Sequence, residues 1–84
     1  MEYRVQSPAQ LAQFLRSART SRGLSQAELG ERLGLSQSRI ARMEGTPSKI
    51  SVGALMDLLA ALGARLVIAE PHEESAPARS DEDW

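Results

Sequence analysis

The sequence contains no cysteine and only one histidine among its 84 residues. Without cysteine, neither a disulfide framework nor a thiolate zinc site can form, and a reducing compartment is the simpler expectation. A single histidine is too few for a histidine-based metal site or a catalytic triad. We therefore expect no metal and no cofactor.

Long apolar runs are also absent. No segment approaches the roughly 18 to 20 consecutive apolar residues that a membrane-spanning helix needs. The N-terminal sequence MEYRVQSPAQ is polar where a signal peptide is apolar. We expect a cytoplasmic protein without a membrane partner, and a chain of this length predicts one small domain.

Charge is divided unevenly along the chain. The net charge is -1, but residues 1–69 hold nine Lys or Arg against five Asp or Glu, while residues 70–84 hold six acidic residues and only Arg79 as a base. A basic body attracts polyanions, and an acidic segment repels them. This division suggests two different partners. Residues 70–84 also contain two prolines and almost no apolar residue before the last position, which predicts a disordered tail after a folded domain over 1–69. The alternative is a solvated surface with an idle tail.

Four short helices are predicted from capping residues and apolar spacing. They cover about 8–22, 26–33 and 37–44, followed by a helix that Ser51 caps and Gly63 ends. The fold class is therefore all-α, a compact four-helix domain. The serines that precede these helices have capping roles and no activating base, so an enzyme is not expected.

Residues 64–69, ARLVIA, are rich in branched aliphatic side chains and too short for a convincing helix. We predict a strand here. A single strand has nothing to pair with in this chain, so its expected partner is the same strand of a second copy, which predicts a homodimer. The strand residues are Arg65, Leu66, Val67 and Ile68. The alternative is a continuation of the fourth helix.

The second and third predicted helices have the pattern of a helix-turn-helix. Leu29 and Leu33 are expected to face inward from the first of them, and Ile40 and Met43 from the second. Two glycines and a leucine complete the pattern: Gly30 at the close approach of the helices, Gly34 at the turn, and Leu35 as the anchor of the turn. A glycine inside a helix costs about 1 kcal/mol relative to alanine, which indicates that close packing decides its place.

The segment RTSRGLSQAELGERLGLSQSRIARMEG resembles the helix-turn-helix of the phage-repressor-like transcription regulators, and the resemblance covers about residues 8–63. It implies that the third helix enters the major groove of duplex DNA. The residues that then face base edges are Gln37, Ser38 and Arg42, and Arg39 is a further candidate for a base or a phosphate. Gln pairs with adenine and Arg with guanine, while Ser is less selective. The alternative is a polar, solvated helix face.

Phosphate contacts are expected around the same helix. Gln26 would present its amide and the unpaired N–H groups of its helix to a phosphate. Further along the chain, the candidates that could hold the backbone are Ser36, Thr46, Ser48 and Lys49.

Other charged residues are expected to differ in role. Arg19 and Glu44 resemble the family's buried pair between the first helix and the end of the third, and so have a structural role. Arg16 and Arg22 either attract phosphate or are merely solvated.

The tail narrows the resemblance to antitoxins of the HipBA type. In such antitoxins the strand pairs within the dimer, and the tail and body contact a HipA-like serine/threonine-kinase toxin. The tail residues expected to bind it are Asp81, Glu82, Asp83 and Trp84. Trp84 suits a partner's pocket, since aromatic anchors dominate many interfaces.

The resemblance thus implies a repressor of its own operon that binds palindromic operator DNA as a homodimer and neutralises the toxin. The alternatives are a stand-alone regulator of phage type without a toxin, and a protein-interaction module that no longer reads DNA. A terminal tryptophan without a role is the alternative reading of Trp84.

Overall fold

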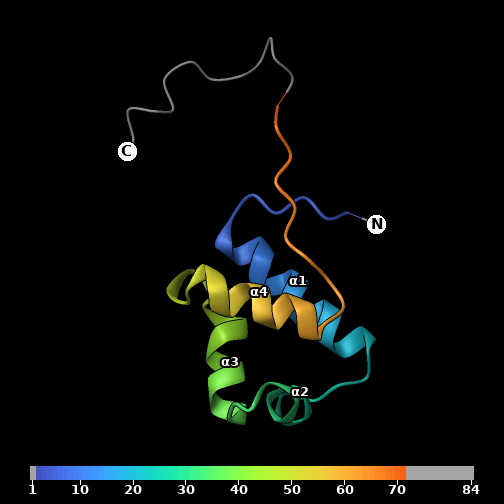
Figure 1. Ribbon diagram of the computed structural model, residues 1–84, viewed down its shortest axis with the longest axis vertical. Helices are drawn as coiled ribbons and strands as arrows, with labels where there is room; N and C mark the ends of the chain where they lie inside the picture. Colours follow the sequence, from blue (N-terminus) through green and yellow to red (C-terminus); the bar gives the residue numbers. More distant parts are fainter. Residues whose placement is uncertain (1, 72–84) are drawn as a thin grey trace.

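The helices begin and end within one or two residues of the predicted bounds. In the computed structural model, which describes residues 2–71, α1 spans Pro8–Ser21, α2 Gln26–Leu33, α3 Gln37–Gly45 and α4 Val52–Ala61 (Figure 1). A 3₁₀ turn, η1, spans Pro47–Lys49 between α3 and α4. Over residues 2–71 the fold is all-helical, as predicted.

Each α-helix starts at a serine whose hydroxyl accepts a backbone hydrogen bond from the third residue of the helix. The four caps are Ser7, Ser25, Ser36 and Ser51, with oxygen–nitrogen distances of 3.0–3.2 Å. At α2 the cap is reciprocal, because Glu28 Oε1 also accepts from the Ser25 N–H over 2.8 Å. Such caps satisfy N–H groups that have no partner within the helix, which fixes where each helix begins.

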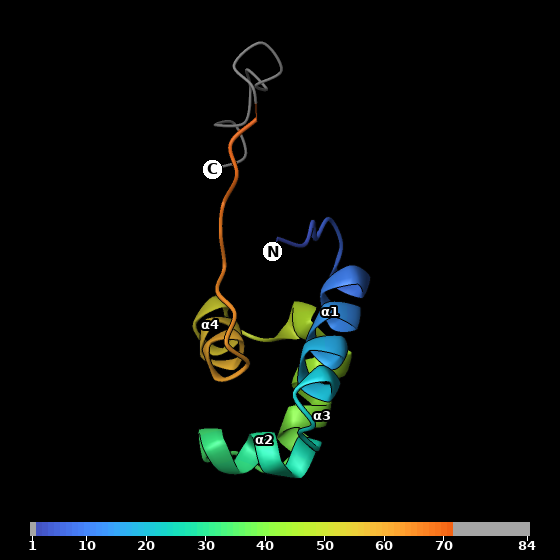
Figure 2. The ribbon, with the colours of Figure 1, turned by 90° about the vertical axis from the view of Figure 1, so that its right-hand side faces the viewer.

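A tight turn sets α2 across one end of α3 (Figures 1 and 2). Gly34 ends α2 in the left-handed region, with φ of 71°, where a side chain would be strained. Gly30 lies against the turn: a Cβ there would collide with the carbonyl oxygen of Leu35 and press on Ile40 Cγ1. Gly30 is therefore a close-approach glycine, as predicted, and its nearest neighbour is the backbone of the turn.

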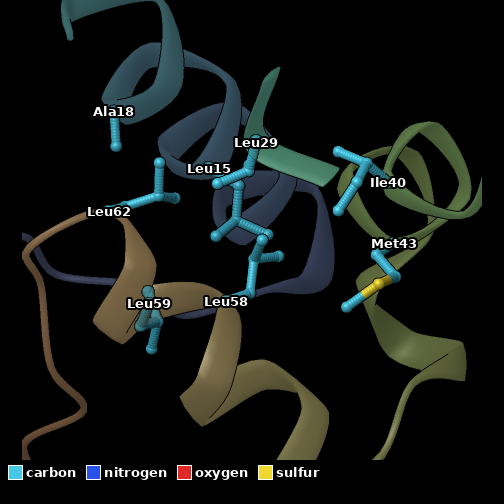
Figure 3. Packing of buried hydrophobic residues seen from close by; sticks show 8 residues of the cluster. All are labelled: Leu15, Ala18, Leu29, Ile40, Met43, Leu58, Leu59 and Leu62. Atoms are coloured by element: carbon cyan, nitrogen blue, oxygen red, sulfur yellow. The ribbon is translucent and has the colours of Figure 1, made fainter. Parts of the chain in front are cut away.

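The core lies where α4 covers the other three α-helices (Figure 3). Its side chains come from all four α-helices: Leu15, Ala18, Leu29, Ile40, Met43, Leu58, Leu59 and Leu62, which follows the last turn of α4. Full burial of a leucine stabilises a fold by about 1.5–3 kcal/mol, so this cluster dominates the stability of the domain. Leu33 is only partly buried against the cluster, and Leu35 keeps 36% of its surface exposed. The anchoring role predicted for Leu35 thus belongs more to its backbone than to its side chain.

The chain after α4 runs away from the helices in an extended path (Figure 2). Residues 64–71 are neither helix nor strand, and Leu66, Val67 and Ile68 are exposed. The helical alternative is wrong, because Gly63 turns the chain at φ of 74° directly after α4. The strand is not confirmed, since one chain offers this segment no edge to pair with.

Candidate nucleic-acid interface

The outward face of α3 is polar, and its inward face is locked into the core. All four residues expected to face base edges are exposed: Gln37, Ser38, Arg39 and Arg42. Ile40 and Met43, on the opposite side, are 0% and 2% exposed. The two faces follow the 3.6-residue period of a helix, so the packing of the apolar side decides which side chains meet solvent.

Gln26 and Gln37 meet because each is the first residue of its helix, α2 and α3 respectively. Gln37 Nε2 donates a hydrogen bond of 2.6 Å to Gln26 Oε1. Gln26 Nε2 in turn donates to Glu44 Oε1 over 3.1 Å. The turn between α2 and α3 thus brings a residue predicted to touch phosphate against one predicted to read a base.

Glu44 lies near the C-terminal end of α3 and is 2% exposed. Its carboxylate receives two bonds from the Arg19 guanidinium of α1, Nε to Oε2 over 2.6 Å and Nη2 to Oε1 over 3.0 Å. Arg19 Nη1 also donates to the carbonyl of Leu24 over 2.8 Å. This two-point pairing fixes α3 to α1 and to the α1–α2 connection, as predicted for the pair.

The Glu44 carboxyl is held in its ionised form. Burial raises its pKa, but hydrogen bonds from Arg19 and Gln26 and the charges of Arg19 and Arg16 outweigh burial, so the pKa of Glu44 lies below its ordinary value. The hydrogen bond to Glu44 raises the pKa of Arg19. An ionised carboxylate only accepts hydrogen bonds, which gives the contact with Gln26 a fixed direction.

The residues expected to touch phosphate form two groups at opposite ends of α3. Gln26 and Ser36 lie at its start, and Ser36 Oγ accepts from the Arg39 N–H over 3.1 Å, which leaves the hydroxyl hydrogen free to donate. The second group is exposed after the end of α3: Thr46, Ser48 and Lys49. A helix of nine residues is about 13 Å long, close to the roughly 12 Å width of the major groove.

Arg22 and Arg16, for which the sequence allows either phosphate attraction or simple solvation, differ in their surroundings in the fold. Arg22 Nη1 donates to the Ala18 carbonyl over 2.9 Å at the end of α1, and its guanidinium lies over Gly63. Arg22 therefore lies where the end of α1 approaches the turn after α4. Arg16 is exposed, and its charge is close enough to lower the pKa of Glu44. No local sequence signal indicates either the bonds of Arg22 or the influence of Arg16 on Glu44.

Several predicted features are not brought to this surface. Arg65, Leu66, Val67 and Ile68 lie in the extended segment beyond α4. The predicted tail contacts Asp81, Glu82, Asp83 and Trp84 lie outside the described residues. Among residues 2–71, no group of three or more His, Cys, Asp or Glu side chains is arranged to hold a metal ion. No helix in the same range has the length and apolar character to cross a membrane.

A family described as "Helix-turn-helix domain" matches residues 2–69. Antitoxin HipB of Escherichia coli O6:H1 is 26% identical over 80 residues, covering 95% of this chain and 85% of the relative. An uncharacterized HTH-type transcriptional regulator of Sinorhizobium fredii is 39% identical over 59 residues, covering 70% of this chain and 30% of the relative. The resemblance to a helix-turn-helix regulator most like HipB is thus confirmed, and with it the expectation that the chain is not an enzyme.

Solved structures have the same fold. A chain from a complex of HipB with the O2 20mer superposes with a TM-score of 0.76 at 25% identity, over 86% of this chain and 100% of that one. A chain from a HipA-HipB-O2-O3 complex gives a TM-score of 0.75 at 24% identity, over 84% of this chain and 100% of that one. The helical arrangement is therefore shared even where the sequence identity is low.

Proposed function

The chain belongs to the helix-turn-helix domain family, and from this premise we propose that it binds operator DNA sequence-specifically as a transcriptional repressor of the HipB antitoxin type. The single observation that carries the proposal is the two-sided character of α3. Its outward side offers donors and acceptors suited to base edges, while its inward side is fixed by the core and by the Arg19–Glu44 pair. A reading helix needs both properties, because a mobile helix cannot hold side chains in register with bases.

Base contacts in this proposal come from four residues: Gln37, Ser38, Arg39 and Arg42. Phosphate contacts come from the two groups at the ends of α3: Gln26, Ser36, Thr46, Ser48 and Lys49. Contacts to phosphate set register and affinity, and contacts to bases set sequence preference.

Two copies act together in the proposed complex. Residues 1–69 form the DNA-binding and dimerisation domain, and the exposed apolar side chains of 64–69 support pairing of this segment with its counterpart in a second copy. A two-fold dimer presents two α3 helices about 34 Å apart, one turn of DNA, which selects a palindromic operator.

The proposed second partner is a HipA-like kinase toxin. The relative that aligns with 95% of this chain is named an antitoxin, and a neighbour of the same fold comes from a complex that contains HipA. Both observations support a toxin–antitoxin role. The proposal places this role in the cytoplasm and includes autoregulation of the operon. The acidic residues 70–84 and Trp84 are the proposed contacts to the toxin, with Trp84 filling a pocket and the carboxylates meeting a basic rim.

A stand-alone regulator is the second candidate. It is favoured by the 39% identity to the Sinorhizobium fredii regulator, which exceeds the 26% identity to antitoxin HipB of Escherichia coli O6:H1. In that case residues 70–84 serve solubility and there is no toxin partner.

Selection from a randomised duplex pool tests the DNA-binding proposal, and enrichment of a palindromic sequence is expected. A folded, dimeric preparation that enriches no sequence would contradict it. Deletion of residues 70–84 then separates the two candidates. The antitoxin predicts unchanged operator binding with loss of a partner that co-purifies from the native cell, whereas a stand-alone regulator has no such partner to lose.

A further inference from the structure

A groove of about 180 Å³ lies beside the exposed face of α3, between this helix, the turn after α2, and α4. The groove is lined by six residues: Leu33, Leu35, Arg39, Met43, Ala54 and Asp57. Four of the six are apolar. The two charged ones, Arg39 of α3 and Asp57 of α4, have opposite signs, so two helices bring an acid and a base to one small space.

Arg39 lies at the edge of the exposed face of α3 rather than at its centre. At 3.6 residues per turn, it is about 100° around the helix from Ser38 and about 40° from the buried Met43. This edge faces α4, because Arg39 and Met43 line the same groove as Ala54 and Asp57. The long side chain of Arg39 can therefore lie along the groove toward Asp57 or point outward from α3.

Both charges are available for a new partner. Among residues 2–71, the only ion pair within 4.0 Å joins Arg19 to Glu44. Arg39 and Asp57 are exposed, so neither is committed to the interior of the fold. The guanidinium of Arg39 thus has two competing anions within its reach when a duplex lies on α3, the carboxylate of Asp57 and the DNA backbone.

We propose that Asp57 is a positioning residue that competes with DNA for the Arg39 guanidinium and thereby limits the affinity of α3 for duplexes. The assignment rests on the proposed DNA-binding function and adds a residue that sets its strength. In the free chain, the carboxylate draws Arg39 along the groove, where the aliphatic part of its side chain covers Leu35 and Met43. On DNA the guanidinium leaves the groove for the duplex, and Asp57 is left unpaired beside a polyanion.

The deciding variant is Asp57→Asn, which removes the charge, keeps the size and changes an exposed position. Its affinity for a random duplex and for the operator enriched by the unaltered chain is expected to rise by about 1.5- to 5-fold for each copy, the worth of a partly exposed ion pair. The dependence of log affinity on log salt should become steeper, by up to about 0.9 for each copy, because Arg39 then meets phosphate without a competing acid. Asp57→Glu keeps the charge and should keep the lower affinity.

Removal of any acidic charge can strengthen DNA binding, so the gain must be shown to pass through Arg39. In the Arg39→Ala background, Asp57→Asn should give no gain, because the side chain for which it competes is absent. The matched control is Glu31→Gln, at an exposed acid of α2 outside the groove. Its effect on affinity should be the same with Arg39 or with alanine at that position.

The outcomes separate the assignment from the function on which it rests. An unchanged affinity in folded Asp57→Asn, or a gain that persists in full in the Arg39→Ala background, overturns the assignment while DNA binding stands. A gain that disappears in that background, together with a background-independent Glu31→Gln, supports it. If the unaltered chain binds no duplex even at low salt, the proposed function and the assignment are both wrong.

Discussion

Arg42 is one helical turn beyond Ser38 on the exposed side of α3, and a guanidinium there can reach either a base or a phosphate. Replacement by alanine, Arg42→Ala, is expected to cost about 1–3 kcal/mol of binding free energy and to relax the preference at one base position. The measurement is an affinity for the operator and for a random duplex at the same salt concentration. An equal loss on both duplexes would show that Arg42 only holds phosphate.

The ionised carboxyl of Glu44 makes the stability of the fold depend on pH. Its pKa is lowered in the folded protein, so its ionised form stabilises the fold fully above the unfolded pKa of about 4.3, and this contribution is lost as the pH falls through the folded pKa. Wild type should therefore lose stability toward urea as the pH falls below the unfolded pKa and then through the lower folded pKa. Part of this loss should be absent in Glu44→Gln, which has no carboxyl to protonate. Glu44→Gln is also expected to be less stable at pH 7, by up to about 3–5 kcal/mol, because Arg19 loses its charged partner.

Urea unfolding at several pH values checks both statements. Glu28→Gln is the comparison variant, because Glu28 is a second carboxyl with a lowered pKa but lies at the exposed start of α2. Hydrogen bonds from the backbone and the hydroxyl of Ser25 lower the pKa of Glu28. An acid dependence in Glu44→Gln as steep as that of the wild type would show that the buried pair does not contribute to it.

At the scale of the elements, the contact between α2 and the turn has the sharpest test. Gly30→Ala gains about 1 kcal/mol of helix propensity, but its Cβ meets the backbone of Leu35, which cannot rotate away as a side chain does. Overpacking of this kind costs about 1–3 kcal/mol, so we expect a net loss of stability. Gly45→Ala is the matched control, since Gly45 is also helical and nothing lies within 4 Å of its added Cβ. The midpoint temperature of thermal unfolding should fall in Gly30→Ala and rise in Gly45→Ala. Equal shifts in the two variants would contradict the close approach of Gly30 to the turn.

The bounds of the helices are the feature of the fold that the sequence predicts best. Capping serines and left-handed glycines act over three or four residues, so the starts of all four α-helices and the ends of α1, α2 and α4 follow from short patterns. The Arg19–Glu44 pair was found only through the family resemblance, because its members are 25 residues apart. The bond from Gln26 to Glu44 cannot be predicted from the sequence, since Gln26 carries a signal for a helix start but none for a contact 18 residues away. Arg22 has no local signal for the same reason: its place beside Gly63 depends on how the end of α1 lies against the turn after α4.

For the whole molecule, the extended segment after α4 decides the proposed assembly. A proline in a strand removes a ladder hydrogen bond, and in a two-fold dimer both strands carry the change. Each lost hydrogen bond costs about 0.5–1.5 kcal/mol, and the dimer loses one from each copy. Val67→Pro should therefore weaken dimerisation by about 5- to 150-fold. The helical domain should remain folded, because Val67 is exposed and lies outside every helix.

Sedimentation equilibrium measures the dimer dissociation constant directly. Glu70→Pro, one residue beyond the predicted strand, is the control and should leave the constant unchanged. If Val67→Pro dimerises as tightly as the wild type, the two copies meet elsewhere. The sequence could not decide this point, because the pairing partner of 64–69 is not part of the same chain.

The carboxylate of Glu44 has two roles. It pairs with Arg19 to hold α3 against α1, and it holds Gln26, which in turn accepts a hydrogen bond from Gln37. Relatives that drift toward new operators are therefore expected to diverge first at Ser38, Arg39 and Arg42, whose exchange disturbs no interior contact. Gln37 is bonded to Gln26, so its replacement would leave Gln26 without this partner. Evolutionary change at Gln26 and Gln37 should therefore come as paired substitutions rather than single ones.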